Sequence, residues 1–266
     1  MNHLLRALAP ISDSSWELLD EEATERLTPA LAARKLVDFS GPHGWEYSAS
    51  NLGRTAPLTS TPCDGVSGLQ RRVMPLVELR ADFEISRAEL RDADRGAIDP
   101  DLEALDIASH QIAVAENISV FHGWHGAITG IEEASPHERL HLGETTNDYP
   151  QPVAAAVERL LHHGISGPYA LALGGEQYQR VVETAENGGY PLLEHLRKII
   201  EGPLIWAPGV KGALVLSTRG EDFLFESGQD LALGYDSHDA EVVRFYIGES
   251  FSFRVATPEA AVVLHP

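Results

Sequence analysis

Two histidines at metal-binding spacing are the strongest chemical signal in this sequence. The segment HERLH, from His137 to His141, has the letters of the HExxH pattern, in which two histidines one helical turn apart bind zinc and the glutamate activates water. Pro136 and Gly143 leave room for only about two helical turns, and no clear third ligand follows. We therefore interpret the segment as an exposed loop, and keep a zinc hydrolase using His137, Glu138 and His141 as a weaker alternative.

A second histidine pair is also a candidate metal site, and the other catalytic templates are missing. His122 and His125, in FHGWHG, form a second close pair, but neighbouring glycines loosen the backbone and no third ligand adjoins them. The sequence contains no GxxxxGK(S/T) phosphate loop, no GxGxxG fingerprint and no GxSxG nucleophile elbow. The single cysteine, Cys63, excludes a CxxC site and an intrachain disulfide. We expect no catalytic residue, no metal and no cofactor.

Composition narrows the class of protein. The 266 residues are 43% hydrophobic, which is too apolar for a disordered chain. Forty acidic against twenty basic residues give a formal charge of −20, which repels nucleic acid and anionic membranes. No apolar run approaches the length that crosses a bilayer, and the cysteine content fits a reducing compartment, so we expect a cytoplasmic protein. Self-association of such a chain requires large apolar contacts.

The N-terminal part predicts helix followed by an extended arm. Trp16, Leu19, Ala23 and Leu27 recur at helical spacing after N-cap candidates at Ser12 and Asp13. Pro29 should bend or restart the helix, and residues 30–37 are expected to continue as a second helical stretch with Leu31, Arg34 and Asp38 near one side. Residues 38–68 are rich in Gly, Ser, Thr and Pro, which indicates a loop or extended arm.

The rest of the chain predicts strands at both ends of an α/β lobe. Apolar residues alternate with charged ones from Val73 to Ile85 and again over residues 243–255, which indicates two long strands with one wet face. An apolar stripe predicts a long helix over residues 101–120. The middle third predicts helices over 152–163, 177–186 and 192–200, and buried strands over 169–173 and 213–216. Patterned surfaces without an active centre favour self-assembly.

Six segments spread along the whole chain carry a family resemblance. They are RALAPIS near the start, ARKLVDFSGPHGWEY, PLVELRADFEI, GYPLLEHLRKIIEGPLIWAPGVKGALVLSTRGEDF, GQDLALGY and ESFSFRV. In the same order, these segments resemble the encapsulins, the linocin-type shell proteins of prokaryotic nanocompartments.

This resemblance implies an α+β fold of the tailed-phage major capsid type (Hong Kong 97 type), with a peripheral domain, an axial domain and an extended loop. Residues 1–50 would form the N-terminal helical segment and the start of the peripheral domain, 51–72 the extended loop that overlaps a neighbour, and 73–130 the peripheral domain with its long spine helix. Residues 131–221 would form the axial domain, and 222–266 would return to the peripheral domain.

The resemblance also implies a function. The chain would be a non-enzymatic subunit of an icosahedral shell of about 60 copies. The shell would enclose a cargo enzyme that docks through a terminal targeting peptide. The favoured cargo is a dye-decolorising peroxidase, and the next is a ferritin-like protein. A prophage major capsid protein is the main alternative, although such proteins usually carry an N-terminal scaffolding segment before the first helix.

Two sets of site residues follow from the same resemblance. The cargo peptide would bind at Leu31, Arg34, Asp38, Leu231 and Leu233. The leucines would receive apolar side chains, and Arg34 and Asp38, four residues apart, would either orient the peptide or simply pair with each other on a helix surface. The rim of the five-fold pore would be Glu186, Asn187, Gly188, Gly189 and Tyr190, a segment that on its own pattern also fits an ordinary turn.

Overall fold

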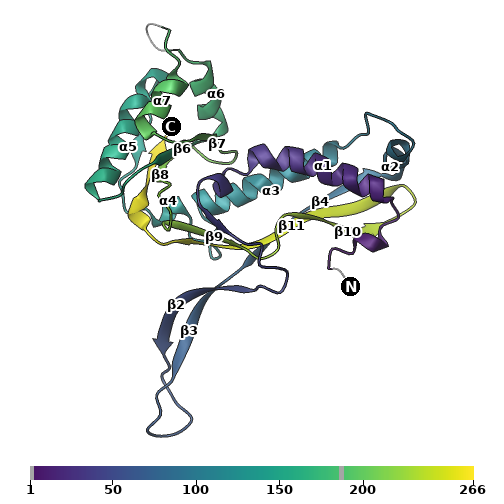
Figure 1. Ribbon diagram of the computed structural model, residues 1–266, viewed down its shortest axis with the longest axis horizontal. Coiled ribbons are helices and arrows are strands. Elements are labelled where there is room, and N and C mark those ends of the chain that lie inside the picture. Colours follow the sequence, from purple (N-terminus) through teal and green to yellow (C-terminus); the bar gives the residue numbers. More distant parts are fainter. Residues whose placement is uncertain (1–2, 186–188) are drawn as a thin grey trace.

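The computed structural model describes residues 3–185 and 189–266. It has two lobes and a thin two-stranded arm that projects away from both of them (Figure 1). Each lobe contains a five-stranded sheet, and the arm is a separate pair of strands. No helix within these described residues combines the length and the apolarity that crossing a bilayer requires.

The first lobe is a sheet with two long helices on one face (Figure 1). Its central strand is β11 (Val242–Val255), which pairs antiparallel with β4, β10 and β9, while β1 adds parallel to β9. The other strands are β1 (Asp38–Ser40), β4 (Val77–Ser86), β9 (Phe223–Ser227) and β10 (Ala232–His238). The helices are α1 (Asp13–Ala30), α2 (Arg87–Asp94) and α3 (Glu103–Phe121).

Local sequence explains why α1 and β4 form and how they pack. The Ser12 hydroxyl caps α1 by accepting a hydrogen bond from the Ser15 backbone N–H. The buried face of α1 carries the residues predicted from helical spacing, with Leu19 fully buried. Strand β4 alternates as expected, with Phe83 and Ile85 buried beneath the helices. One apolar core therefore lies between this sheet and α1 and α3.

The second lobe is a mixed sheet with the strand order β5-β12-β8-β6-β7. Its strands are β5 (Leu140–His141), β6 (Tyr169–Leu173), β7 (Leu204–Trp206), β8 (Ala213–Ser217) and β12 (Ala261–His265). Its helices are α4 (Ile131–Ala134), α5 (Pro150–His162), α6 (Gly175–Glu183) and α7 (Leu192–Ile200). Every residue of β6 and β8 is buried, which is the pattern of strands covered on both faces.

Strand β11 connects the two lobes. Phe245 and Ile247 in its first half pack in the core beneath α1 and α3, whereas Phe251 and Phe253 in its second half belong to the other core. The Phe225 ring of β9 stacks on Phe251 with the ring centroids 4.7 Å apart. The lobes therefore share a rigid strand rather than a flexible linker.

The arm consists of β2 (Ala49–Pro57) and β3 (Leu69–Pro75), paired antiparallel. The structure has an extended arm, but its bounds differ from the expected 38–68, because residues 38–40 form β1 of the first sheet and the paired strands β2 and β3 carry the arm to Pro75. Four large apolar side chains of the arm and its tip are half exposed or more: Leu58, Val66, Leu69 and Val73. A two-stranded ribbon with exposed apolar residues is only marginally stable by itself, so this segment needs a covering surface.

Four expectations about elements need correction. Residues 30–37 are not a second helix, because the chain leaves α1 at Ala30 and makes only a short 3₁₀ turn, Ala33–Lys35. The strand expected over 73–85 is interrupted between Pro75 and Val77, since β3 belongs to the arm and β4 to the sheet. The helix expected over 177–186 ends at Glu183. Residues 261–265 do not return to the first lobe, because the buried apolar strand β12 pairs with β8 in the second.

Candidate functional site

Arg34 lies in the 3₁₀ turn after α1 and is surrounded by carboxylates. Its guanidinium donates to Glu116 at 2.6 Å, to Glu249 at 2.6 Å and to Asp230 at 2.5 Å. These partners come from α3, from β11 and from the turn before β10. The Arg34 side chain is only 14% exposed. It therefore joins three parts of the first lobe that are far apart in the sequence.

Two of the three carboxylates are buried. The side chains of Glu116 and Glu249 are 0% and 1% exposed, while Asp230 is 41% exposed. Burial raises the pKa of both glutamates above the ordinary value, and for Glu249 the negative charge of Glu116 adds to the effect. Burial disfavours the Arg34 cation, but the three carboxylates outweigh that and raise the pKa of Arg34. Arg34 also lies over the Phe39 ring, with its central guanidinium carbon 5.1 Å from the centroid.

Asp38 does not pair with Arg34, so the alternative in which the two residues simply pair on a helix surface is wrong. The chain is extended at Asp38, the first residue of β1, and its carboxylate accepts a hydrogen bond from the Glu221 backbone N–H at 2.7 Å. On a helix these two side chains would be neighbours, but the 3₁₀ turn ends at Lys35, before the chain reaches Asp38. The Arg34 guanidinium instead donates its hydrogen bonds to Glu116, Glu249 and Asp230.

The three leucines of the expected cargo site lie at one apolar cluster but differ in exposure. Leu31 and Leu231 are half buried and pack against the core beneath α1, whereas Leu233 is 3% exposed and belongs to that core. Leu31 and Leu231 are therefore partly accessible from the surface, whereas Leu233 is not.

A groove near Leu31 was not predicted from the sequence. It is a hollow of about 560 Å³ between the end of α1 and the second lobe, lined by Pro29, Lys35, Gly175, Tyr178, Gln179, Leu204, Ile205 and Trp206. Trp206 and Ile205 are half buried and at the end of β7. No local pattern pointed to this groove, because it forms only where the two lobes meet.

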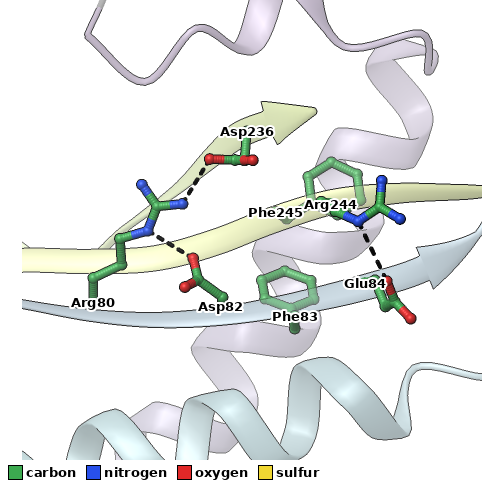
Figure 2. Close-up of a pocket in the computed structure, with 7 residues that line it drawn as sticks. All are labelled: Arg80, Asp82, Phe83, Glu84, Asp236, Arg244 and Phe245. Carbon is green, nitrogen blue, oxygen red and sulfur yellow. Dashed lines mark hydrogen bonds and ion pairs between the residues drawn. The ribbon is translucent and has the colours of Figure 1, made fainter. Parts of the chain in front are cut away.

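The face of the first sheet opposite the helices carries charge. A hollow of about 460 Å³ lies there, and Figure 2 shows the side chains that line it. Arg80 bridges Asp82 at 2.6 Å and Asp236 at 2.8 Å, and Arg244 lies 3.6 Å from Glu84 (Figure 2). These side chains are the polar half of the alternation seen in the sequence, so this sheet has one apolar and one charged face.

The expected pore loop lies partly outside the described residues, which exclude Glu186, Asn187 and Gly188. Gly189 adopts a positive φ of 80°, a conformation that favours glycine. The Tyr190 ring is 39% exposed, and the Lys198 ammonium lies 4.8 Å from its centroid. Ala185 and Pro191 form an isolated bridge, so the two sides of the loop start close together.

The HERLH segment does not have the geometry of a zinc motif. It is not helical: Leu140 and His141 form β5, and the His141 ring accepts from the Gly143 backbone N–H at 2.9 Å. His137 contacts the Glu259 backbone carbonyl at 2.9 Å, and His122 pairs with Glu132. Over residues 3–185 and 189–266, no three His, Cys, Asp or Glu side chains gather as a metal site would require.

The sequence is similar to known proteins over almost its whole length. The family model Linocin_M18, described as "Encapsulating protein for peroxidase", matches residues 1–252. The chain is 48% identical to a type 1 encapsulin shell protein of Rhodospirillum rubrum, over 99% of this chain and 96% of the relative. It is 39% identical to the type 1 encapsulin shell protein of Mycobacterium tuberculosis, over 99% of each.

Solved structures agree at the level of the fold. A virus-like particle from Pyrococcus furiosus superposes with a TM-score of 0.68 at 18% identity, covering 94% of this chain and 99% of that one. The Mycobacterium phage Ogopogo structure gives a TM-score of 0.56 at 15% identity, covering 87% and 90%. The two lobes and the arm thus form the α+β fold of Hong Kong 97-type capsids, and the chain belongs to the encapsulin family of shell proteins.

Proposed function

We propose that this chain assembles into a closed icosahedral shell of about 60 copies in the cytoplasm, encloses a cargo enzyme, and catalyses no reaction itself. The observation that supports assembly most strongly is the arm, a projecting two-stranded ribbon (Figure 1) whose large apolar side chains Leu58, Val66, Leu69 and Val73 are left exposed by its own chain. Relatives described as shell proteins over 99% of this chain support the same conclusion. A second copy is the natural cover for the arm.

Charge supports contact between the arm and another copy. Residues 49–75 contain three arginines, Arg54, Arg71 and Arg72, and one aspartate, Asp64, so the arm is basic in a chain of charge −20. The charged sheet face in Figure 2 offers three carboxylates, those of Asp82, Glu84 and Asp236, which outnumber its two arginines. Opposite charges would steer the arm toward such a surface, while apolar contacts would hold it.

Assembly can be tested with two apolar-to-acid changes. Leu58→Asp combined with Leu69→Asp should leave a folded subunit with native circular dichroism but shift the particle to small species in size-exclusion chromatography. Leu161→Asp, at an exposed leucine of α5, is the matched control. Shells that form normally with the doubly substituted arm would contradict the proposal that the arm holds copies together.

We further propose that the cargo peptide lies along Leu31 and Leu231 and extends into the groove lined by Pro29, Ile205 and Trp206. The half-buried leucines and the groove are apolar and adjoin the end of α1. In this proposal Arg34 and Leu233 do not contact the peptide but hold the surrounding elements in place from the buried side. Asp38 lies at the edge of the site. A dye-decolorising peroxidase is the favoured cargo because the matched family is described as encapsulating a peroxidase, and a ferritin-like protein is the next choice.

Cargo docking can be tested independently of assembly. Leu231→Asp should form shells of normal size but capture much less co-expressed cargo than the wild type, as measured by the cargo-to-shell ratio on a gel. Leu161→Asp shells serve as the control. A normal ratio in Leu231→Asp would exclude this surface as the docking site.

The pore rim proposed from the sequence is 186–190, of which Gly189 and Tyr190 are described. Tyr190→Ala would widen such a rim, so an iodide quencher should reach an enclosed fluorophore faster in stopped-flow experiments. An unchanged quenching rate would place the entry route elsewhere.

A further inference from the structure

Two buried glutamates share a single arginine at the centre of the first lobe. Glu116 and Glu249 each use one carboxylate oxygen, Oε2, to accept a hydrogen bond from Arg34 at 2.6 Å. The other oxygen of each, Oε1, is buried and has no hydrogen-bond partner among the described residues. Because both bind nitrogens of one guanidinium, Nε and Nη2 of Arg34, the two carboxyl groups lie beside each other. Two neighbouring buried carboxylates that each keep an unpaired oxygen would be strongly unfavourable.

The neighbouring cations do not neutralise the negative charges that Glu116 and Glu249 would carry if both were ionised. Arg34 is the cation that both glutamates bind, and it also binds Asp230 from the turn before β10. Lys35, the other cation on the 3₁₀ turn, instead donates to the Pro29 backbone carbonyl. On the other side of the sheet, the hollow beside Glu249 is lined by His3, Glu78, Arg80 and Tyr246. Arg80 there is already paired with Asp82 and Asp236. If both glutamates were ionised, three carboxylates would therefore face one guanidinium.

We propose that Glu116 and Glu249 share one proton at neutral pH, so that the junction of α1, α3 and β11 is a proton-dependent clasp that weakens as the solution becomes alkaline. One Oε1 then carries the proton and donates to the other Oε1, which satisfies both buried atoms. The cluster becomes one shared negative charge against Arg34, with the more exposed Asp230 partly screened by water. This inference concerns the folded subunit and does not depend on the cargo.

The direction of the pH dependence follows from the burial. Burial raises the pKa of both glutamates in the folded state, so the folded chain keeps a proton that the unfolded chain releases. The stabilisation is complete below the ordinary carboxyl pKa and is lost as the pH rises through the raised folded pKa. Each pH unit within that window changes the unfolding equilibrium about tenfold for one proton.

Infrared spectroscopy of the assembled shell tests the proposal directly. A protonated carboxylic acid gives a carbonyl band, separate from that of carboxylates, that shifts in deuterium oxide. Wild-type shells at neutral pH should show this band, and Glu249→Gln and Glu116→Gln shells should each lack it. Glu226→Gln should retain it, because Glu226 is bound by Tyr47 and its pKa is lowered despite partial burial. A wild-type spectrum without the band, or a band unaffected by both pair substitutions, would overturn the proposal.

Heat-induced unfolding across pH provides a second readout. Glutamine imitates the protonated acid, so Glu249→Gln should lose less of its melting temperature than the wild type between neutral and alkaline buffers. Glu226→Gln should follow the wild type. If Glu249→Gln does not fold, Glu116→Gln and the wild-type infrared spectrum still decide the question. Parallel pH profiles for wild type and both glutamine variants would contradict the clasp.

Discussion

Removing the Arg34 cation should destabilise the subunit far more than removing a surface arginine. Arg34→Met retains a long apolar side chain over Phe39 but leaves Glu116 and Glu249 buried without their cation. Breaking a buried pair by deleting one partner costs about 3–5 kcal/mol, because the remaining charge has neither water nor a counter-ion. A typical domain has about 5–15 kcal/mol of stability in total, so this loss is a large fraction of it.

The measurement is the denaturant midpoint of the shells, followed by tryptophan fluorescence. Arg26→Met is the matched control, because Arg26 pairs with Glu22 and Asp106 at a half-exposed site where solvent screens the charges. The midpoint should fall strongly for Arg34→Met and hardly for Arg26→Met. Adding Glu116→Gln and Glu249→Gln to Arg34→Met should recover much of the loss, since no buried charge then remains. Equal midpoints for the two methionine variants would refute the reasoning.

Three further predictions concern individual contacts. Asn117→Ala should cost about 3 kcal/mol, because the buried amide makes four hydrogen bonds that hold the end of α1 and the loop after β7, and differential scanning calorimetry would measure the loss. Gly234→Ala should lower the melting temperature, since a Cβ there would lie 2.1 Å from the Tyr246 ring and would displace that ring from Arg80; a wild-type melting temperature would contradict this. Two backbone N–H groups and Arg244 lower the pKa of Asp239 to about 2, so its stabilisation is present above the ordinary carboxyl pKa and lost as the pH falls; Asp239→Asn should flatten that part of an acid-unfolding curve.

Sequence patterns predicted the elements that have one apolar face. Trp16 and Leu19 on α1, Phe83 and Ile85 on β4, and the stripe of α3 all lie where their spacing indicated. Such elements depend on local periodicity, which a single sequence contains. The short strands β1, β5 and β7 were missed because two or three residues carry no period, and they exist only through pairing with distant strands.

The candidate site was harder to predict for the same reason. Arg34 was singled out, but its partners Glu116, Asp230 and Glu249 are 82, 196 and 215 residues away in the sequence. One signal was available: Glu116 lies on the apolar side of a long helix, where a carboxylate requires a buried partner. The groove between Pro29 and Trp206 had no such signal, since its two walls belong to different lobes.

The mass of the purified protein tests the central claim most directly. The account predicts, by mass photometry or cryo-electron microscopy without added cargo, hollow particles of one uniform size. About 60 copies of a 29.0 kDa chain would weigh roughly 1.7 MDa. A stable 29.0 kDa monomer at working concentration, with no closed particle in the images, would contradict the account.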